Sequence, residues 1–535
     1  MERKRYPVLC MLLVLAMLIS GCSAPLFPDF PFAQQQPVSY ASMHYDQPDM
    51  DELQSLLEEC VKQSMRGSLH DLLNSIYAFY DAYDSFYTNY ALADIRYCGN
   101  LSDPYWKQAF DYCSQNAPVA DDALDTLYRI LANSPLRLKL ESEEYFGKDF
   151  FVAYEGENPM DAHYLDLLEQ EAELVNRYYA LSEEALTEEY YSEAYFSKYG
   201  TQMAQLFLEL IALRQEIAAY LGYSDYAQYA YDVYYYREYT PAEAERYLQD
   251  VGQTFYDLYC DLGTADVWSS GYAPCGETET FQYVKDVSTS MGGDIADAFA
   301  LLEESGLYDI AYSENKYDTS FETYLWTYHV PFIFMNSQLQ QQDKLVFSHE
   351  FGHFLNDYYC GGSYAGTDVA EVHSQAFEYL SLCYAKDSGD LAKYKLADSL
   401  SVYMECAAYA LFEQQVYRLT GDALTEENVE ALYTQVGTQF GFDTWEWDTR
   451  DYVTISHFFT DPMYNISYVV SNDLAMQFYR MELETPGSGL ALYEQCLLSE
   501  DSYLITFASD FGLDSPFTPG GLEKTAEVFR SALYE

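Results

Sequence analysis

The stretch from His349 to His353 spells HExxH, and it constrains this chain more than any other feature of the sequence. On an α-helix, residues four positions apart lie on one face, so both imidazoles can bind one metal ion. Glu350 follows the first histidine directly, and its side chain is then expected beside the metal and not on it. Two histidine ligands next to such a glutamate are typical of hydrolytic zinc sites, in which the glutamate is the general base.

The residues around the motif predict a buried helix that ends at two glycines. Apolar residues at 345–347 and 354–355 continue the helical spacing on both sides of the motif. Gly352 falls inside this helix, where glycine costs about 1 kcal/mol relative to alanine. A neighbouring backbone or a ligand is therefore expected to need the missing side chain. Gly361 and Gly362 predict the end of the helix.

A third metal ligand is predicted on the next helix. A metzincin would carry glycine at position 356 and histidine at 359, but this chain has asparagine and tyrosine there, which excludes that class. Residues 367–378 indicate a new helix with Asp368 as its N-cap. Glu371 lies 18 residues after His353, enough chain for a return onto the first helix. A carboxylate there completes a His2Glu set whose fourth position is open to water.

Three neighbouring residues have less certain roles. His373 is expected on the other side of the helix from Glu371, as a packing or surface histidine. Glu378 shares the face of Glu371, and it is either a partner of a metal ligand or a solvated carboxylate. An alternative interpretation is a structural zinc site, in which Cys360 would be the fourth ligand. Such sites are usually rich in cysteine and have no use for Glu350.

At these residues the chain resembles the thimet oligopeptidase and oligoendopeptidase F family of zinc metallopeptidases. Residues 349–353 are similar to the metal-binding helix of that family, and residues 370–374 to its third-ligand segment. Residues 330–336 resemble the strand before the metal helix, and residues 457–468 the His/Tyr segment that faces the metal. A weaker likeness at 221–241 extends the resemblance over roughly residues 200–480.

The sequence departs from the family pattern at two positions. His373 stands where relatives often carry a small residue or proline, and Asn465 stands where many carry tyrosine. Both departures fall outside the predicted ligand set, so they concern the lining of the site.

The resemblance implies a fold, an activity and further site residues. It implies a mainly α fold with two lobes about a deep substrate channel, one small β-sheet near the HExxH helix, and activity on short peptides. It also implies that Tyr468 stabilises the oxyanion, with His457 and Tyr464 orienting the substrate.

The expected reaction is zinc-dependent hydrolysis of peptide bonds. One Zn2+ ion held by His349, His353 and Glu371 would lower the pKa of its bound water toward about 7. Glu350 would take a proton from that water and pass it to the leaving amine. The β-prone residues 331–336 are either an edge strand that pairs with the substrate backbone or a simple core strand.

Helical spacing also dominates the rest of the chain. Long stretches such as 164–189 and 192–221 carry charges opposite an apolar face, and strand-like runs are few. The length of 535 residues is sufficient for two or three lobes. We expect a helical N-terminal lobe at 51–300 and a catalytic zinc lobe at 301–535, which together form one peptidase unit.

The N-terminus has the features of a lipoprotein targeting segment. A basic start and twelve apolar residues from 8 to 19, too few to span a bilayer, predict a signal peptide at 1–21. Cys22 ends a lipobox-like sequence, so we expect an acylated bacterial lipoprotein outside the cytoplasm, anchored through this residue alone. An ordinary secretory signal is the alternative. Residues 22–50, rich in proline, are expected to form a tether.

Charge and cysteine content restrict the partners. A net charge of −59 excludes nucleic acid and bare anionic lipid as partners and leaves short peptides as the expected ones. Of 11 cysteines, Cys10 lies in the signal peptide and Cys22 is the anchor, so the odd number left includes at least one unpaired thiol.

Two other functions compete with a zinc endopeptidase. A peptide-binding lipoprotein without catalysis fits the targeting segment equally well, but it has no need of Glu350 beside two histidines. A related zinc carboxypeptidase or dipeptidyl peptidase shares the same catalytic set.

Overall fold

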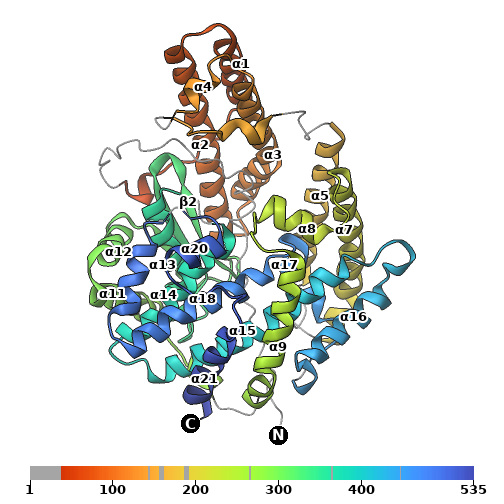
Figure 1. Cartoon of the computed structure of the whole chain (residues 1–535), viewed down its shortest axis with the longest axis vertical. Helices are drawn as coiled ribbons and strands as arrows, with labels where there is room; N and C mark the ends of the chain where they lie inside the picture. Colours follow the sequence, from red (N-terminus) through yellow and green to blue (C-terminus); the bar gives the residue numbers. More distant parts are fainter. Residues whose placement is uncertain are drawn as a thin grey trace.

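The computed structural model of the chain describes residues 38–142, 145–155, 162–185, 192–263, 267–362, 366–445, 447–499 and 501–534 (Figure 1). The predicted signal peptide, Cys22 and most of the predicted tether lie outside these residues. Helices account for most of the described chain, and one small sheet accompanies them. The predicted mainly α fold with one small sheet is therefore confirmed.

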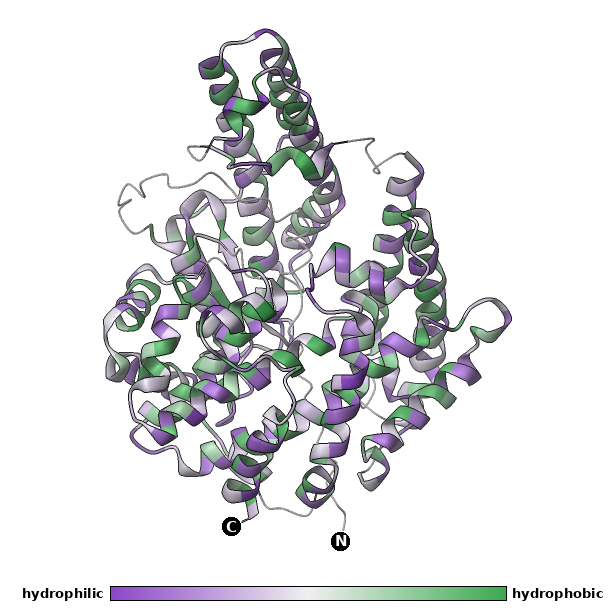
Figure 2. Cartoon of the chain, viewed as in Figure 1, coloured by the Kyte–Doolittle hydropathy of each residue, from purple (hydrophilic) through white to green (hydrophobic). Residues whose placement is uncertain are grey.

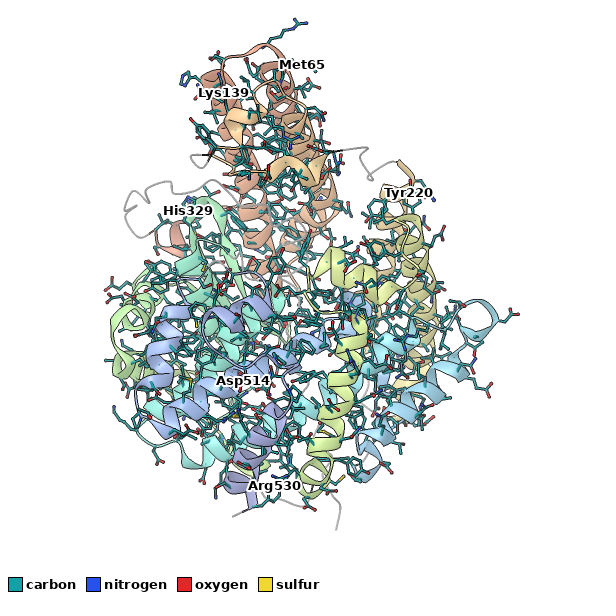
Figure 3. The ribbon with its side chains drawn as sticks, viewed as in Figure 1. Met65, Lys139, Tyr220, His329, Asp514 and Arg530 are labelled. Atoms are coloured by element: carbon teal, nitrogen blue, oxygen red, sulfur yellow. The ribbon has the colours of Figure 1, made fainter. Side chains whose placement is uncertain are left out.

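The first helices form a separate unit that projects at the top of Figure 1. Most of their buried residues, from Leu53 to Phe151, make a hydrophobic cluster of their own, whereas Ala91, Leu92, Ile95 and Cys98 belong to the main core. Met65 and Lys139, labelled in Figure 3, mark the far end of this unit. Its helices are α1 (Met50–Arg66), α2 (Leu69–Gly99), α3 (Pro104–Ala132) and α4 (Arg137–Leu140).

The end of the predicted tether is packed against this unit. Met43 is 1% exposed, and its carbonyl accepts a hydrogen bond of 2.7 Å from Arg96 Nη2. The ring of Tyr40 lies 4.3 Å from that of Phe332 in the sheet. Residues 40–49 therefore belong to the folded body and not to an extended tether, because they supply apolar side chains that the core buries.

The rest of the chain shares one continuous hydrophobic core with Met43 and the end of α2, and this core extends to Phe529 in the sequence. The boundary predicted at residue 300 does not divide this core. Apolar and polar residues are interleaved on the helices of this part in Figure 2, as expected where each helix buries one face. The helices before the sheet are α5 (Ala162–Ala185), α6 (Glu193–Tyr195), α7 (Thr201–Tyr220), α8 (Tyr226–Tyr229), α9 (Pro241–Leu262), α10 (Trp268–Gly271), α11 (Glu277–Met291) and α12 (Gly293–Ser305).

The sheet has three strands in the order β1-β3-β2. β1 (Tyr308–Asp309) pairs in parallel with β3 (Val330–Met335), and β2 (Ser320–Leu325) pairs antiparallel along its full length, from Ser320 opposite Met335 to Leu325 opposite Val330. All of β3 is buried. β3 is the central strand, with β2 paired along one edge and β1 paired at Ile333 and Phe334 on the other. The interpretation of residues 331–336 as an edge strand for substrate is therefore wrong. A six-residue run that is buried on both faces suits a central strand.

The helices after the sheet carry the predicted site. They are α13 (Asp343–Cys360), α14 (Thr367–Tyr384), α15 (Gly389–Val416), α16 (Glu426–Gln439), α17 (Ser456–Thr460), α18 (Asn465–Glu484), α19 (Ser488–Cys496), α20 (Leu504–Asp510) and α21 (Gly521–Tyr534). α14 packs on both α13 and α18. The third-ligand helix is thus held between the HExxH helix and the helix that begins in the His/Tyr segment.

Gly352 determines how closely α13 and α14 approach. A Cβ atom at this position would lie 2.5 Å from Ser374 Cα and 2.7 Å from the carbonyl oxygen of His373, both closer than real contacts allow. The neighbouring backbone is therefore the reason for a glycine inside the helix. α13 ends as predicted, with Gly361 in the left-handed conformation at φ 68°.

Three further structural facts complete the fold. α14 begins at Thr367 with Gly366 as its N-cap, two residues before the predicted cap, so Asp368 lies inside the first turn and does not cap the helix. All nine cysteines of the described residues are free thiols. Within the described ranges, no helix combines the length and the apolar character that crossing a membrane requires.

Candidate metal centre

The three predicted ligands come together in the structure. One ligand atom from each of His349, His353 and Glu371 lies within 4.8 Å of the others, and all three residues are buried. His349 Nε2 is 3.4 Å from Glu371 Oε2, and His353 Nε2 is 3.9 Å from the same oxygen. The two turns of α13 and the first turn of α14 place two nitrogens and one oxygen around a common point.

The donor set fits a divalent metal ion. Although it is buried, His349 Nε2 has no hydrogen-bond partner among the described residues. Two imidazoles and a carboxylate are a ligand set that zinc accepts, and among the described residues no fourth protein ligand joins this cluster. A site with three protein ligands leaves a coordination position for water or substrate.

Glu378 and Lys395 fix the orientation of His349 on the side of its ring away from the metal position. Glu378 Oε1 lies 2.9 Å from His349 Nδ1, and Lys395 Nζ lies 2.7 Å from Glu378 Oε2. Burial opposes ionisation of Glu378, but Lys395 and His349 outweigh it and lower its pKa. An ionised carboxylate at Nδ1 fixes the imidazole with Nε2 toward the metal position. Of the two roles considered for Glu378, the structure supports that of a ligand partner.

Electrostatics distinguish the two histidines. Burial lowers the pKa of His349, but Glu371 and Glu378 raise it more, to about 9 without a metal. Burial and the neighbouring His349 lower the pKa of His353 well below its usual value. His353 is therefore already neutral, as a metal ligand must be, whereas His349 must lose a proton when a cation binds.

Glu350 is completely buried beside this cluster. Neither of its carboxylate oxygens has a hydrogen-bond partner among the described residues. Burial raises its pKa to about 7, with His349 acting in the opposite direction. A carboxylate with such a pKa and free oxygens can accept and return a proton near neutral pH.

The predicted His/Tyr segment reaches the cluster through Tyr464. The Tyr464 hydroxyl donates a hydrogen bond of 2.7 Å to Glu371 Oε1. Tyr468 OH lies 3.3 Å from His457 Nε2, and the rings of Tyr464 and Tyr468 are 5.1 Å apart. Burial lowers the pKa of His457 to about 4, so this imidazole is neutral. The structure thus brings all seven predicted site residues into one region.

The structural-zinc interpretation is wrong. Cys360 lies two turns beyond His353, and its thiol donates to the carbonyls of Ser499 at 3.2 Å and Leu497 at 3.6 Å. It takes no part in the cluster. Helical spacing places Cys360 on the face of His353, but it does not predict that the chain after residue 490 packs against this end of α13 and binds the thiol.

His373 is fully inside the protein and not at the surface. It is 1% exposed, and burial lowers its pKa to about 3. Its ring lies at the edges of Tyr493 and Phe507, at 5.9 and 5.7 Å. His373 is therefore a packing residue, the first of the two roles that the sequence left open.

Sequence reasoning missed the charged residues that support the site. Lys395, Arg237 and Glu413 are buried and lie 24 or more residues from the ligands in sequence. At Lys395 and Glu413 the sequence signal is a charge inside an apolar helical run, as at Glu413 after Ala410, Leu411 and Phe412. Arg237 lies outside the helices and has no such signal.

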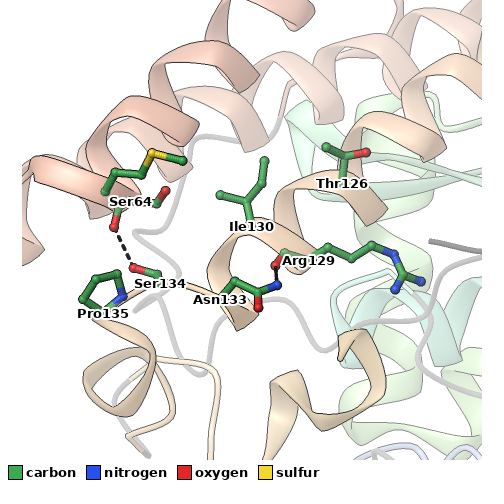
Figure 4. A pocket seen from close by; sticks show the side chains of 8 residues that line it. Ser64, Thr126, Arg129, Ile130, Asn133, Ser134 and Pro135 are labelled. Atoms are coloured by element: carbon green, nitrogen blue, oxygen red, sulfur yellow. Dashed lines mark hydrogen bonds between the residues drawn. The ribbon is translucent and has the colours of Figure 1, made fainter. Parts of the chain in front are cut away.

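A separate hollow of about 360 Å³ has no catalytic groups. It lies between α1 and α3 (Figure 4), and Ser134 Oγ crosses it to donate to the Ser64 carbonyl at 2.8 Å. Arg129, on its wall, is already paired with Asp125. Its lining shares no residue with the metal cluster.

Comparisons with known proteins agree with this geometry. Residues 40–158 match the peptidase M3 N-terminal domain. A comparison with curated protein sequences gives no match. The predicted family resemblance is confirmed. The match covers the projecting helical unit, a part of the chain in which sequence reasoning had found no likeness.

Solved structures share the fold over almost the whole chain. A protein described as an oligoendopeptidase F is 20% identical, with a TM-score of 0.81 over 93% of this chain and 98% of the other. PZ peptidase A with an inhibitor is 18% identical, with a TM-score of 0.80 over 92% and 98%. An oligoendopeptidase F of Bacillus anthracis is also 18% identical, with a TM-score of 0.78 over 93% and 98%. The fold is thus that of M3-type peptidases.

Proposed function

We propose that this chain is a zinc-dependent oligopeptidase that hydrolyses internal bonds of short peptides. One observation carries the proposal: Glu350, buried and without a hydrogen-bond partner among the described residues, lies next to three convergent ligands. A protein that only binds peptides has no use for a proton acceptor at this position. The match to the M3 N-terminal domain and the shared fold support the same conclusion.

Each residue has a defined part in the reaction. His349, His353 and Glu371 would hold the zinc ion, with Glu378 and Lys395 fixing His349. When bound, zinc would polarise the substrate carbonyl and lower the pKa of water. Glu350 accepts a proton from the attacking water and delivers it to the leaving amine.

The His/Tyr segment would stabilise the developing charge. Tyr468 keeps its predicted role as the donor to the oxyanion, and its pair with His457 orients the hydroxyl. A preorganised donor of this kind contributes about 3 kcal/mol to the transition state. Tyr464, which donates to Glu371, orients that ligand in addition to its proposed contact with substrate.

The test is cleavage of a quenched fluorogenic oligopeptide whose two ends are blocked. We expect cleavage that a chelator abolishes and that added zinc restores, and no cleavage by Glu350→Gln with its zinc retained. Blocked ends exclude an exopeptidase, so cleavage only of peptides with a free terminus would overturn the endopeptidase assignment. Binding without any cleavage would support a peptide receptor instead.

A further inference from the structure

The backbone at Met463 has an unusual conformation next to the site. Met463 has φ 71°, in the left-handed region that residues with a side chain rarely adopt, and it is 1% exposed. It immediately precedes Tyr464 and the start of α18. Strained residues that the surroundings hold in place are concentrated at functional sites.

Two buried ionisable side chains bond this residue on opposite sides. Arg237 Nη1 donates to the Met463 carbonyl at 2.9 Å, and Glu413 Oε1 accepts from the Met463 N–H at 2.8 Å. The other oxygen of Glu413 accepts from Asn465 Nδ2 at 2.9 Å. The side chain of Arg237 and the whole of Glu413 are each 1% exposed. Burial raises the pKa of Glu413 to about 8, while the hydrogen bonds from Asn465 and from the Met463 N–H act in the opposite direction. In such a dry environment hydrogen bonds are stronger than in water and favour one backbone conformation.

Arg237 also connects this backbone to the third-ligand helix. Its Nη2 donates to Ser467 Oγ at 2.8 Å, and Ser467 Oγ donates to Asp368 Oδ1 at 2.5 Å. Asp368 lies three residues before Glu371 on α14, and Tyr239 donates to its other oxygen at 2.7 Å. The guanidinium lies 4.1 Å from the ring centroid of Tyr235, which leaves it little freedom to move.

We propose that Arg237 and Glu413 are positioning residues of the peptidase site. They fix the peptide groups on both sides of Met463, and this direction of the chain places Tyr464 against Glu371 and Tyr468 against His457. The inference rests on the proposed function, since it assigns these tyrosines a place in the reaction. It adds two buried polar side chains, distant in sequence, that determine where the tyrosines lie.

Glu413→Gln tests the inference with a change of almost no volume. The Met463 N–H and the Asn465 amide each donate to a different oxygen of Glu413, and glutamine replaces one of these oxygens with an NH2 group that cannot accept. We expect kcat to fall about 10- to 100-fold, as small displacements of reacting groups do. KM, zinc content and the melting temperature should change little, and in a crystal structure the Tyr464 hydroxyl should leave Glu371.

The Glu413→Gln/Asn465→Asp double variant is the matched rescue. The amide of Gln at position 413 can donate to the carboxylate of Asp at position 465 and still accept from the Met463 N–H. The hydrogen-bond pattern of the wild type is therefore restored. We expect the double variant to recover wild-type kcat within about threefold, whereas Asn465→Asp alone, with two facing carboxylates, should not. A purely structural role would not produce recovery in kcat with an unchanged melting temperature.

The outcomes separate the two proposals. Wild-type protein without any peptidase activity would overturn the proposed function, and the crystal structures of the variants would then still decide whether Glu413 fixes the tyrosines. An active wild type with unchanged kcat in Glu413→Gln, or no recovery in a folded double variant, would overturn the inference. If Glu413→Gln does not fold, Arg237→Lys is compared in its place. Failure of all variants to fold would also overturn the inference, because the residues would then serve the fold as a whole.

Discussion

Burial acts in opposite directions on Glu350 and His373, which lie in the same pair of packed helices. It raises the pKa of the carboxyl group to about 7 and lowers that of the imidazole to about 3, because in both cases the charged form loses its hydration. Glu350 lies against metal ligands, where a titrating group is useful for catalysis. His373 contacts aromatic rings, so its burial affects stability.

Because His373 is buried in its neutral form, we expect the free energy of unfolding to decrease as the pH falls. Its folded-state pKa is depressed below the unfolded value of about 6.5, so neutral His373 favours folding above that pH and the contribution is lost as pH falls toward about 3. We expect His373→Phe to flatten the decline of unfolding free energy below pH 6.5 by up to about 1.4 kcal/mol per pH unit. Denaturant unfolding at several pH values measures this. The exposed His70→Phe is the control, and equal slopes for both variants would contradict the account.

At the scale of elements, the close contact of α13 and α14 builds the site. The contact brings Glu371 to the two histidines, and Gly352 permits it because a Cβ would collide with the backbone at Ser374. Helical spacing alone predicted the ligand set, since both motifs are local in sequence. It did not predict β3 as the central strand, because pairing with β1 is a property of the folded sheet.

Gly352→Ala should separate these helices. We expect it to destabilise the protein by about 1–3 kcal/mol through overpacking and to weaken zinc binding at least tenfold, because Glu371 moves away from the histidines. Gly99→Ala, at the end of α2 with open space around the Cβ position, is the control and should leave both quantities nearly unchanged. Calorimetric melting and a zinc titration measure the two effects. Wild-type zinc affinity in Gly352→Ala would show that the helices tolerate the extra carbon.

At the scale of the whole molecule, sequence patterns predicted the fold class but not how the helices are divided between hydrophobic cores. One hydrophobic core extends across residue 300, while a second core lies within residues 40–158, the range that matches the M3 N-terminal domain. Helical periodicity is visible in a sequence, whereas the choice of which helices share a core depends on contacts between distant residues such as Arg214 and Phe459. For the same reason the supporting charges Lys395, Arg237 and Glu413 were not identified beforehand.

The proposed anchor gives a prediction for the whole chain. If Cys22 is acylated, the protein should fractionate with membranes, and Cys22→Ser should release it into the soluble fraction with unchanged peptidase activity. The activity should persist because the lipid is separated from the site by the segment up to residue 40. A protein that stays with membranes after Cys22→Ser would contradict the predicted anchoring, and Cys10→Ser is the control within the signal peptide.

The zinc dissociation constant of Glu371→Gln tests the account most directly. Loss of the only carboxylate ligand should weaken zinc binding at least about 100-fold, more than the loss of a residue that only supports a ligand. Glu350→Gln, whose side chain lies beside the ligands without joining them, should bind zinc within threefold of the wild type. Equal zinc affinity in Glu371→Gln and the wild type would contradict the three-ligand site on which the proposed peptidase depends.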